Sequence, residues 1–416
     1  MSTTQPIDQI EVGAEQFLWA KKNMPVLQLA NNYLKRKHAK KCLSGIRIGV
    51  CLHISKETAV LIDAFQSLGM KIDLVAANPL STKDSIAAYL RSLGVIVRGR
   101  SFGSEEDYSS DIELLARSSP EMIIDDGGEL HVAYSRTHGH SCFGGTDETT
   151  SGTSRLISLA KQRKLRYPVI LVNEAKTKHF FDNKYGTGQS SLDGLMRATG
   201  LLVAGKVVVV CGYGWVGKGV AERVRGMGAR VIVTEVDPVS ALEAHLDGYE
   251  VKKMVEAASE GQIFLTCTGQ TDVLTRRHFK RMRDGAILGN CGHFDREINA
   301  NDLKTVSESK NKVNPYMDEY RISGRSIFLL CDGRVVNLVA AEGHPPEIMQ
   351  LSFANQLLAI FYLASKKAEL KDTSPKVLPV PRQVDDLVSE FALKTFGLGI
   401  DSLNKKQRSY ANSFIR

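Results

Sequence analysis

The sequence predicts an α/β protein with two Rossmann-like, doubly wound parallel-sheet domains and a short C-terminal helical tail. Its 416 residues are too many for one ordinary hydrophobic core. Short apolar runs alternate with amphipathic segments, a pattern typical of a parallel sheet covered by helices on both faces. A glycine-rich turn between a strand and a helix begins a second unit of the same kind.

The first unit is expected to follow a helical N-terminal region over residues 11–40 that Pro25 interrupts. This unit lacks a glycine fingerprint for phosphates, so we expect a substrate-binding domain over residues 1–184, completed by 345–380. Its expected strands are 46–53, 71–77, 95–98, 122–125 and 168–173, with helices over 56–69 and 83–94.

The second unit is expected to be a dinucleotide-binding domain over residues 185–344. After its glycine turn, strands are expected over 263–269, 286–293 and 335–344. A helix over 347–366 and an extended, proline-rich connector over 374–386 follow. Residues 381–416 are expected to form a mostly helical oligomerisation tail that Gly397 and Gly399 interrupt.

Charge and cysteine usage limit the partners and the compartment. The formal charge is +8. A basic cluster within residues 35–41 could meet an anionic partner or be a solvated helix end. No aromatic residues interleave with it, so we expect no nucleic acid. The seven scattered cysteines form no Cys-x-x-Cys, and no signal peptide or bilayer-length apolar stretch is evident. We expect a soluble cytoplasmic protein without membrane contact or metal. The basic cluster consists of Lys35, Arg36, Lys37, Lys40 and Lys41.

A dinucleotide site is predicted at Gly212, Gly214 and Gly217, which form G-x-G-x-x-G between a strand and a helix. The glycines permit a tight turn and close approach of the backbone to a pyrophosphate, and the helix N-terminus supplies amide donors. Glu235 ends the next strand, where a carboxylate can accept from a ribose 2′-hydroxyl and repel a 2′-phosphate. The sequence therefore predicts NAD as the cofactor.

Polar clusters follow several expected strands, where α/β proteins place their sites. Together with GYGWVGKG and TEVDP they resemble the motifs of the S-adenosylhomocysteine hydrolase family, from about residue 12 to residue 412. Motifs such as YGTGQS are similar to the archaeal and thermophilic-bacterial branch. The clusters are CLHISKET (51–58), DDGGELH (125–131), TDETTSG (146–152), TKHFFDNKYGTGQS (177–190), GNCGHFD (289–295) and DGRVVNLVAAEGHP (332–345).

The resemblance implies reversible hydrolysis of S-adenosylhomocysteine to adenosine and homocysteine. NAD would oxidise the 3′-hydroxyl and so acidify the C4′ proton, homocysteine would leave by elimination, and water would add before re-reduction. It also implies a homotetramer. The implied catalytic residues are Asp126 at C4′, Lys178 and Asp182 at the 3′-hydroxyl, and His53 and His293 at C5′. Lys178 would need a pKa lowered by burial or by the nearby cofactor charge.

The remaining implied residues bind substrate or cofactor. Glu148 and Thr149 would hold the ribose, and Glu57 would accept from an exocyclic amine of the base. The implied substrate-binding residues are Ser55, Glu57, Glu148, Thr149, Thr187, His344 and Met349. The implied cofactor-binding residues are Gly212, Gly214, Val216, Gly217, Glu235, Thr268, Asn183 and Asn337.

Other interpretations remain open from the residues alone. Asp126 could be a turn residue, Lys178 and Asp182 a surface helix pair, and His53 a satisfied core histidine. The same 3′-oxidation could act on another nucleoside, as in S-inosylhomocysteine hydrolysis or epimerisation. An inactive NAD-binding paralogue is the alternative from a different class.

Two positions and the C-terminal end depart from the family pattern. Many members have a cysteine at Thr187 and an asparagine at Ser240, and many end in a tail that reaches a neighbouring subunit's NAD. Lys406 and Tyr410 could take part of that role here. We therefore expect looser NAD binding.

Overall fold

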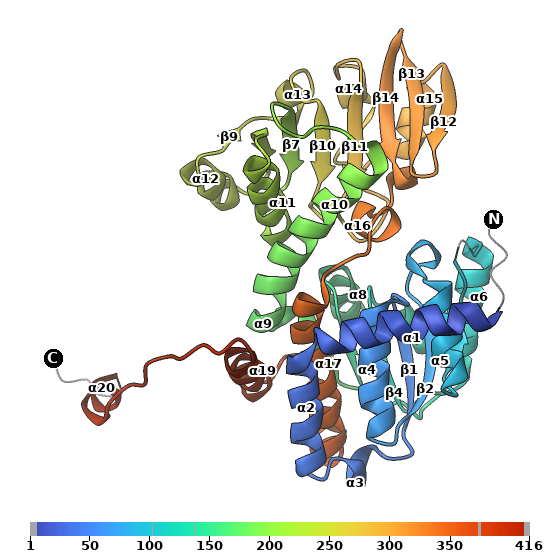
Figure 1. Ribbon diagram of the computed structural model, residues 1–416, viewed down its shortest axis with the longest axis vertical. Helices are drawn as coiled ribbons and strands as arrows, with labels where there is room; N and C mark the ends of the chain where they lie inside the picture. The colour runs from blue at the N-terminus through green and yellow to red at the C-terminus, as the bar shows by residue number, and fades with distance from the viewer. Residues whose placement is uncertain (1–5, 102, 138, 373–375, 412–416) are drawn as a thin grey trace.

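The computed structural model describes residues 6–101, 103–137, 139–372 and 376–411, which form two stacked α/β domains and a projecting C-terminal segment (Figure 1). The first domain has a seven-stranded parallel sheet in the order β15-β6-β5-β4-β1-β2-β3. Its strands are β1 (Arg47–Leu52), β2 (Lys71–Ala76), β3 (Ile96–Arg98), β4 (Met122–Asp125), β5 (Gly144–Asp147), β6 (Val169–Leu171) and β15 (Val377–Pro379).

Helices cover both faces of this first sheet, which confirms its doubly wound character. One apolar core joins the sheet to α2, α4, α17 and α19, and a second joins its other face to α6, α7 and α8. The helices are α1 (Pro6–Lys22), α2 (Pro25–Arg36), α3 (Lys40–Leu43), α4 (Lys56–Ser67), α5 (Asp84–Ser92), α6 (Glu105–Arg117), α7 (Glu129–Arg136), α8 (Thr150–Lys161), α17 (Pro346–Ser365), α18 (Lys367–Leu370) and α19 (Arg382–Thr395).

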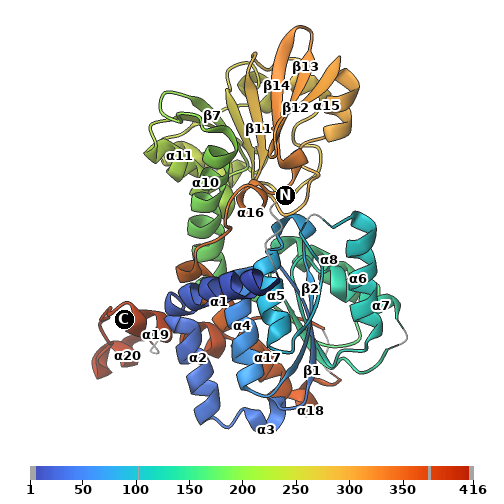
Figure 2. The ribbon, with the colours of Figure 1, turned by 45° about the vertical axis from the view of Figure 1, so that its right-hand side comes forward.

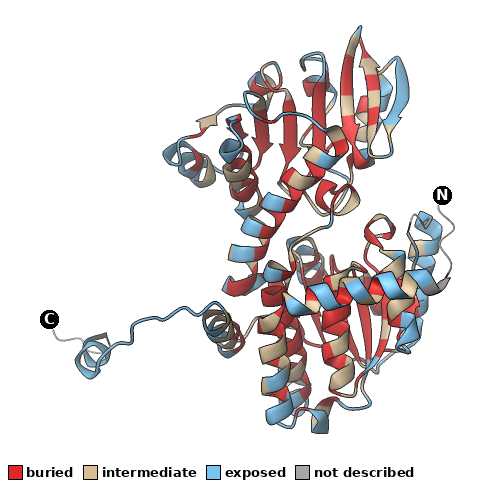
Figure 3. Ribbon diagram, viewed as in Figure 1, coloured by how far each residue is buried: buried red, intermediate tan, exposed pale blue. Residues whose placement is uncertain are grey.

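The second domain has an eight-stranded sheet in the order β12-β13-β14-β11-β10-β7-β8-β9. Its strands are β7 (Val207–Cys211), β8 (Arg230–Thr234), β9 (Glu250–Val251), β10 (Ile263–Thr266), β11 (Ala286–Asn290), β12 (Ser309–Asn314), β13 (Met317–Ile322) and β14 (Arg325–Leu330). Its helices are α10 (Thr187–Thr199), α11 (Trp215–Gly226), α12 (Pro238–Leu246), α13 (Met254–Ala257), α14 (Arg276–Phe279), α15 (Ala300–Val306) and α16 (Val336–Val339). The inner strands are buried in both sheets, whereas β12 is an exposed antiparallel edge strand (Figure 3).

Two passages join the domains, one through α9 (Lys176–Lys178), a π-helical turn (His179–Gly186) and α10, the other from α16 into α17 (Figure 2). The expected strand over 335–344 is wrong, because Cys331 and Asp332 adopt left-handed φ angles that turn the chain out of the sheet. The next residues form α16, in which Val336 and Asn337 are buried. The strand that pairs with β11 is β14 instead.

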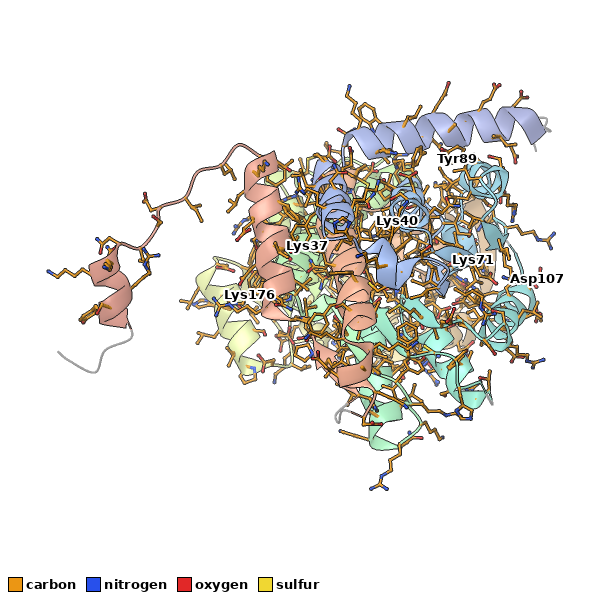
Figure 4. The ribbon with its side chains drawn as sticks, turned by 90° about the horizontal axis from the view of Figure 1, so that it is seen from below. Lys37, Lys40, Lys71, Tyr89, Asp107 and Lys176 are labelled. Atoms are coloured by element: carbon orange, nitrogen blue, oxygen red, sulfur yellow. The ribbon has the colours of Figure 1, made fainter. Side chains whose placement is uncertain are left out.

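The C-terminal segment differs from its expected form. Within the expected connector, β15 pairs with β6 and α19 already begins at Arg382, while residues 373–375 lie outside the described ones. Beyond Gly397 an extended stretch leads to α20 (Lys405–Ala411), which stands apart from the body (Figure 4). The basic cluster is exposed around α3, at the end of the first domain far from the second (Figure 1).

Helix α17 corrects the expectation that no apolar stretch is long enough to span a bilayer. Its 20 residues have a mean hydropathy of 1.3, so by length and composition alone this helix meets the criterion for a membrane span. Of that apolar stretch, 72% is buried inside the protein, because α17 packs against α2, α4 and β5 in the first core. A helix that is apolar all round is also the pattern of a core helix in a soluble protein.

Candidate active site

The site of the first domain lies where its strand order reverses. From β1 the chain winds outward to β2 and β3, then returns to place β4 on the other side of β1. Ligands of open α/β sheets bind in the crevice outside the carboxyl ends of strands at such a switch point. His53 follows β1 and Asp126 follows β4, so the topology brings together two of the residues expected at the substrate.

His53, Asp126 and His293 form a cluster across the two domains. Asp126 Oδ2 lies 3.3 Å from His53 Nε2, and Asp126 Oδ1 lies 3.7 Å from His293 Nδ1. His293 comes from the loop after β11 in the second domain. Gly127 makes room for it, because a Cβ there would lie 2.6 Å from His293 Nε2.

Two histidines and a carboxylate can transfer protons, and they are also zinc ligands by type. The ligand atoms of His53, Asp126 and His293 lie within 4.8 Å of one another. The expectation that the protein uses no metal stays a prediction. Burial lowers the pKa of His53 to about 4, although the neighbouring Asp126 carboxylate opposes this shift. The imidazole of His53 is therefore neutral at neutral pH.

Lys178 is the centre of a second buried cluster, with 2% of its surface exposed. Its Nζ lies 2.6 Å from Asp182 Oδ2 and donates hydrogen bonds to Asn183 Oδ1 at 3.0 Å and Asn173 Oδ1 at 3.2 Å. Glu148 Oε1 lies 4.0 Å away. The π-helical turn begins directly after Lys178 and contains Asp182 and Asn183. Such turns are frequent at functional sites.

The charges in this cluster compensate one another. Burial lowers the pKa of Lys178, but the carboxylates of Asp182 and Glu148 outweigh it, so the net shift is upward. Burial therefore gives no net lowering of the pKa of Lys178, and the lowering expected from the cofactor charge stays a prediction. Burial raises the pKa of Asp182, but Lys178 and His344 hold it well below its usual range. His344 Nδ1 lies 2.5 Å from Asp182 Oδ1.

Glu148 is held from α17 as well as by Lys178. Ser352 and Gln356 both donate hydrogen bonds to its carboxylate, the latter at 2.5 Å. Burial raises the pKa of Glu148 to about 7, and Lys178 partly counteracts the rise. The adjacent Thr149 is the N-cap residue of α8. The site therefore contains a carboxyl group that titrates near neutral pH.

The residues expected around the base come from the start of α4, the start of α10 and the passage from α16 into α17. Glu57 is 2% exposed, and no donor hydrogen-bonds its Oε1 among the described residues, although Lys56 Nζ lies 3.2 Å away. Ser55 caps α4, since its side chain accepts from the N–H of Thr58. Thr187 Oγ1 lies 3.1 Å from His344 Nε2. Met349 is partly buried against the first core.

The second domain has its own switch point between β7 and β10, and the three expected glycines and Thr268 lie beside it. Gly212 has φ +98°, and a Cβ on Gly217 would lie 2.0 Å from the Gly212 carbonyl oxygen. By contrast, a Cβ on Gly214 would meet no atom within 4 Å among the described residues, so space is open above the N-terminus of α11. Val216 is half-buried in the first turn of α11.

The polar residues around this open space fit a dinucleotide. The Glu235 carboxylate, which follows β8, accepts from Tyr213 N and Val236 N at 2.6 Å. Asn337 is 2% exposed, donates to Ser190 Oγ at 3.1 Å, and has an Oδ1 without a partner among the described residues. An orphaned buried amide oxygen is suited to accept from a carboxamide such as that of nicotinamide. The residues present therefore fit NAD.

Two of the expected cofactor residues form hydrogen bonds with other residues of the protein. The hydroxyl and the backbone N–H of Thr268 both donate to Glu297, a buried carboxylate that sequence reasoning missed. Asn183 accepts from Lys178 and donates to Asn173. Asn173 was also missed, although its position at the end of the expected strand 168–173 could have marked it.

Comparisons with known proteins agree with this geometry. The family model described as S-adenosyl-L-homocysteine hydrolase, NAD binding domain, matches residues 183–343, and the model described as S-adenosyl-L-homocysteine hydrolase matches residues 3–140. The chain is 48% identical over 402 residues to the adenosylhomocysteinase of Aeropyrum pernix, covering 96% of this chain and 95% of that protein. The S-inosyl-L-homocysteine hydrolase of Methanocaldococcus jannaschii is 43% identical over 413 residues, with 99% and 98% covered.

Proposed function

The chain belongs to the S-adenosyl-L-homocysteine hydrolase family, and we propose that it reversibly hydrolyses S-adenosyl-L-homocysteine to adenosine and L-homocysteine. As a member of this family it is an NAD-dependent enzyme with an NAD-binding Rossmann domain. The observation that carries the proposal is the convergence of two clusters of titratable side chains, a buried one around Lys178 and a partly buried one around Asp126, at the junction of the domains.

NAD, when bound, supplies reversible oxidation of the substrate 3′-hydroxyl, which makes the C4′ proton acidic. Lys178 and Asp182 would hold the 3′-oxygen and exchange its proton. Glu148, fixed by α17, would bind the ribose hydroxyls. Because Lys178 is an ammonium held by carboxylates, it first acts as a hydrogen-bond donor that positions the 3′-oxygen.

Asp126 would remove the C4′ proton. It is suited to this task because its Oδ1 has no hydrogen-bond donor among the described residues, so a lone pair is available for the proton. His53 and His293 lie on either side of this carboxylate and would handle the protons of the leaving thiol and the attacking water at C5′. Since His293 comes from the second domain, these steps would need the domains together, which also keeps stray nucleophiles away.

Relatives in this family are named for substrates with two different bases, adenine and hypoxanthine. An ionised Glu57 accepts from the exocyclic amine of adenine, which supports adenosine as the nucleoside. Lys56 Nζ lies 3.2 Å from Glu57 Oε1 and could instead donate to the carbonyl of hypoxanthine. S-inosylhomocysteine is therefore the second candidate substrate. A relative at 43% identity is named S-inosyl-L-homocysteine hydrolase.

The same proposal covers the domains and the assembly. Residues 1–184 with 345–380 would bind substrate, residues 185–344 would bind NAD, and residues 381–416 would serve oligomerisation in a cytoplasmic homotetramer. Support for the last point comes from the projecting segment, where Leu398, Ile400 and Leu403 are more than half exposed. Burying such side chains against another copy is favourable. Lys406 and Tyr410 on α20 would then approach a neighbour's cofactor site.

Product analysis tests the function. The purified protein is incubated with NAD, adenosine deaminase and either S-adenosyl- or S-inosyl-homocysteine, and thiol and nucleoside are quantified by liquid chromatography. Equimolar homocysteine and inosine from the adenosyl substrate, faster than from the inosyl substrate, support the proposal. Faster release from the inosyl substrate would favour the second candidate. Thiol release from neither would contradict both.

A further inference from the structure

The two ring nitrogens of His53 have different partners. Nδ1 lies 2.6 Å from the hydroxyl oxygen of Ser81, and Nε2 faces Asp126 Oδ2 at 3.3 Å. Ser81 ends a 3₁₀ turn (Pro79–Ser81) after β2 and is 4% exposed. Sequence reasoning singled out His53 but not Ser81, because the serine stands 28 positions later in the chain.

The hydrogen bonds of Ser81 determine which nitrogen of His53 carries its proton. Ser81 Oγ donates to the carbonyl oxygen of Asn78 at 2.9 Å, and a carbonyl can only accept. A hydroxyl has one hydrogen, so toward His53 the Ser81 oxygen must accept. The donor in that bond is then Nδ1–H of His53.

We propose that Ser81 is a positioning residue, which holds His53 as its Nδ1–H tautomer so that Nε2 faces the site with a free lone pair and takes the proton of the water that adds at C5′. This role rests on the proposed function. As the water oxygen bonds to C5′, its O–H bond breaks and the proton passes to Nε2, while the C4′–C5′ π bond breaks and its electron pair moves to C4′ as the enolate of the 3′-ketone. C4′ then takes back a proton from Asp126. The resulting imidazolium loses that proton to solvent before the next turnover, and in the reverse direction it returns a proton to the departing hydroxide.

The surroundings of His53 make the role of Ser81 necessary. The charged or titratable groups that act on the ring are Asp126, His293 and His344. Without Ser81, the Asp126 carboxylate would favour the other tautomer, because Nε2–H could donate to it. Nε2 would then carry a proton and could not accept one from water. The neutral ring that this argument needs follows from burial.

Thr82 provides a matched control. It is 3% exposed, and its hydroxyl donates to the same Asn78 carbonyl oxygen at 3.2 Å. Among the described residues no hydrogen bond joins Thr82 to His53. Thr82→Val therefore removes a buried hydroxyl from the same turn without touching the histidine, whereas Ser81→Ala removes the one that accepts from Nδ1. Ser81→Thr restores a hydroxyl at the same position.

The experiment reads the tautomer directly. Solid-state ¹⁵N NMR of histidine-labelled holoenzyme, with His53 signals assigned by their loss in His53→Asn, should show a protonated Nδ1 and a bare Nε2 in wild type and in Thr82→Val. Ser81→Ala should show the reverse, and Ser81→Thr should restore the wild-type pattern. A protonated Nε2 in neutral wild-type His53 would overturn the proposal.

Kinetics separate positioning from folding. Synthesis of S-adenosylhomocysteine from adenosine and homocysteine should fall at least about tenfold in Ser81→Ala, because a histidine in the wrong tautomer cannot exchange a proton at C5′ and general acid–base catalysis contributes about 10²- to 10⁴-fold. Exchange of the C4′ proton of adenosine, which precedes the C5′ step, should stay within about twofold of wild type. Equal losses in both assays, or equal losses in Ser81→Ala and Thr82→Val, would overturn the role. Failure of the proposed function would instead appear as an inactive wild type.

Discussion

Asp385 accepts a hydrogen bond from Thr177 Oγ1 at 2.5 Å and thereby links the C-terminal helix α19 to the turn that carries Lys178. The backbone N–H groups of Lys176 and Thr177 also donate to this carboxylate, each at 2.9 Å. Asn355 of α17 donates to Thr177 Oγ1 at 2.8 Å. The position of Lys178 thus depends on residues about 200 positions away.

Replacing Asp385 with Ala should release the start of α9 and let Lys178 move from Asp182. Loss of an N-terminal cap costs about 1 kcal/mol of stability. We expect turnover to fall about tenfold, because misplacement of a positioned group by about 1 Å costs up to about 100-fold. Steady-state kinetics and thermal unfolding test this. Asp386→Ala, at an exposed neighbour that pairs with Arg382, should change neither; matching losses in both variants would contradict the role of Asp385.

Lys178→Met should abolish most catalysis while leaving NAD binding intact. The lysine donates to the site, and removing a group that transfers protons costs about 10²- to 10⁴-fold in rate. Lys176→Met is the control, since Lys176 is exposed and contributes only its backbone N–H to Asp385. Turnover and NAD titration are measured for both. Full activity in Lys178→Met would remove this lysine from the mechanism.

Gly214→Ala should weaken NAD binding at least about tenfold without lowering stability. Gly214 has φ −71°, which alanine adopts readily, and its Cβ would enter open space where the backbone is expected to approach a pyrophosphate. Gly226→Ala, whose Cβ also meets no described atom within 4 Å, is the control. Calorimetric titration with NAD gives the affinity. Unchanged affinity in Gly214→Ala would show that the pyrophosphate does not bind against Gly214.

Glu148 makes the stability of the protein sensitive to pH. Its pKa rises from 4.5 to about 7 on folding, so between these values the folded state binds more protons and stability falls as pH rises. Glu148→Gln should therefore gain stability over wild type across this window, by up to about 3 kcal/mol at pH 7 and above. Denaturant unfolding from pH 4.5 to 8 measures it, with exposed Glu347→Gln as control. A pH-independent difference would contradict the shift.

The parts of the fold that sequence predicts are those encoded by local patterns. The strand and glycine turn at Gly212 stand within one short segment, and the first sheet follows from apolar runs such as 46–53. Strand β5 was missed because Gly144–Asp147 contains no large apolar residue, although all four of its residues are buried. Strand 335–344 was wrong because left-handed residues, which sequence does not mark, turn the chain away.

The candidate site shows the same division. Its residues at strand ends, such as His53 and Asp126, could be named because parallel strands bring their carboxyl ends to one edge. Ser81, Asp385 and Gln356 could not, because each acts through a contact with a residue distant in sequence. The pKa of Lys178 depends on two carboxylates that only the folded chain brings near it.

The most direct test of the account is exchange of the C4′ proton of adenosine in D₂O, followed by ¹H NMR with NAD-loaded protein and without homocysteine. Oxidation at C3′ and proton removal by Asp126 predict that the H4′ signal decays with wild type. The decay should slow by at least about 100-fold with Asp126→Asn, since general base catalysis contributes about 10² to 10⁴. Thiol release from S-adenosylhomocysteine with no H4′ exchange would contradict the account.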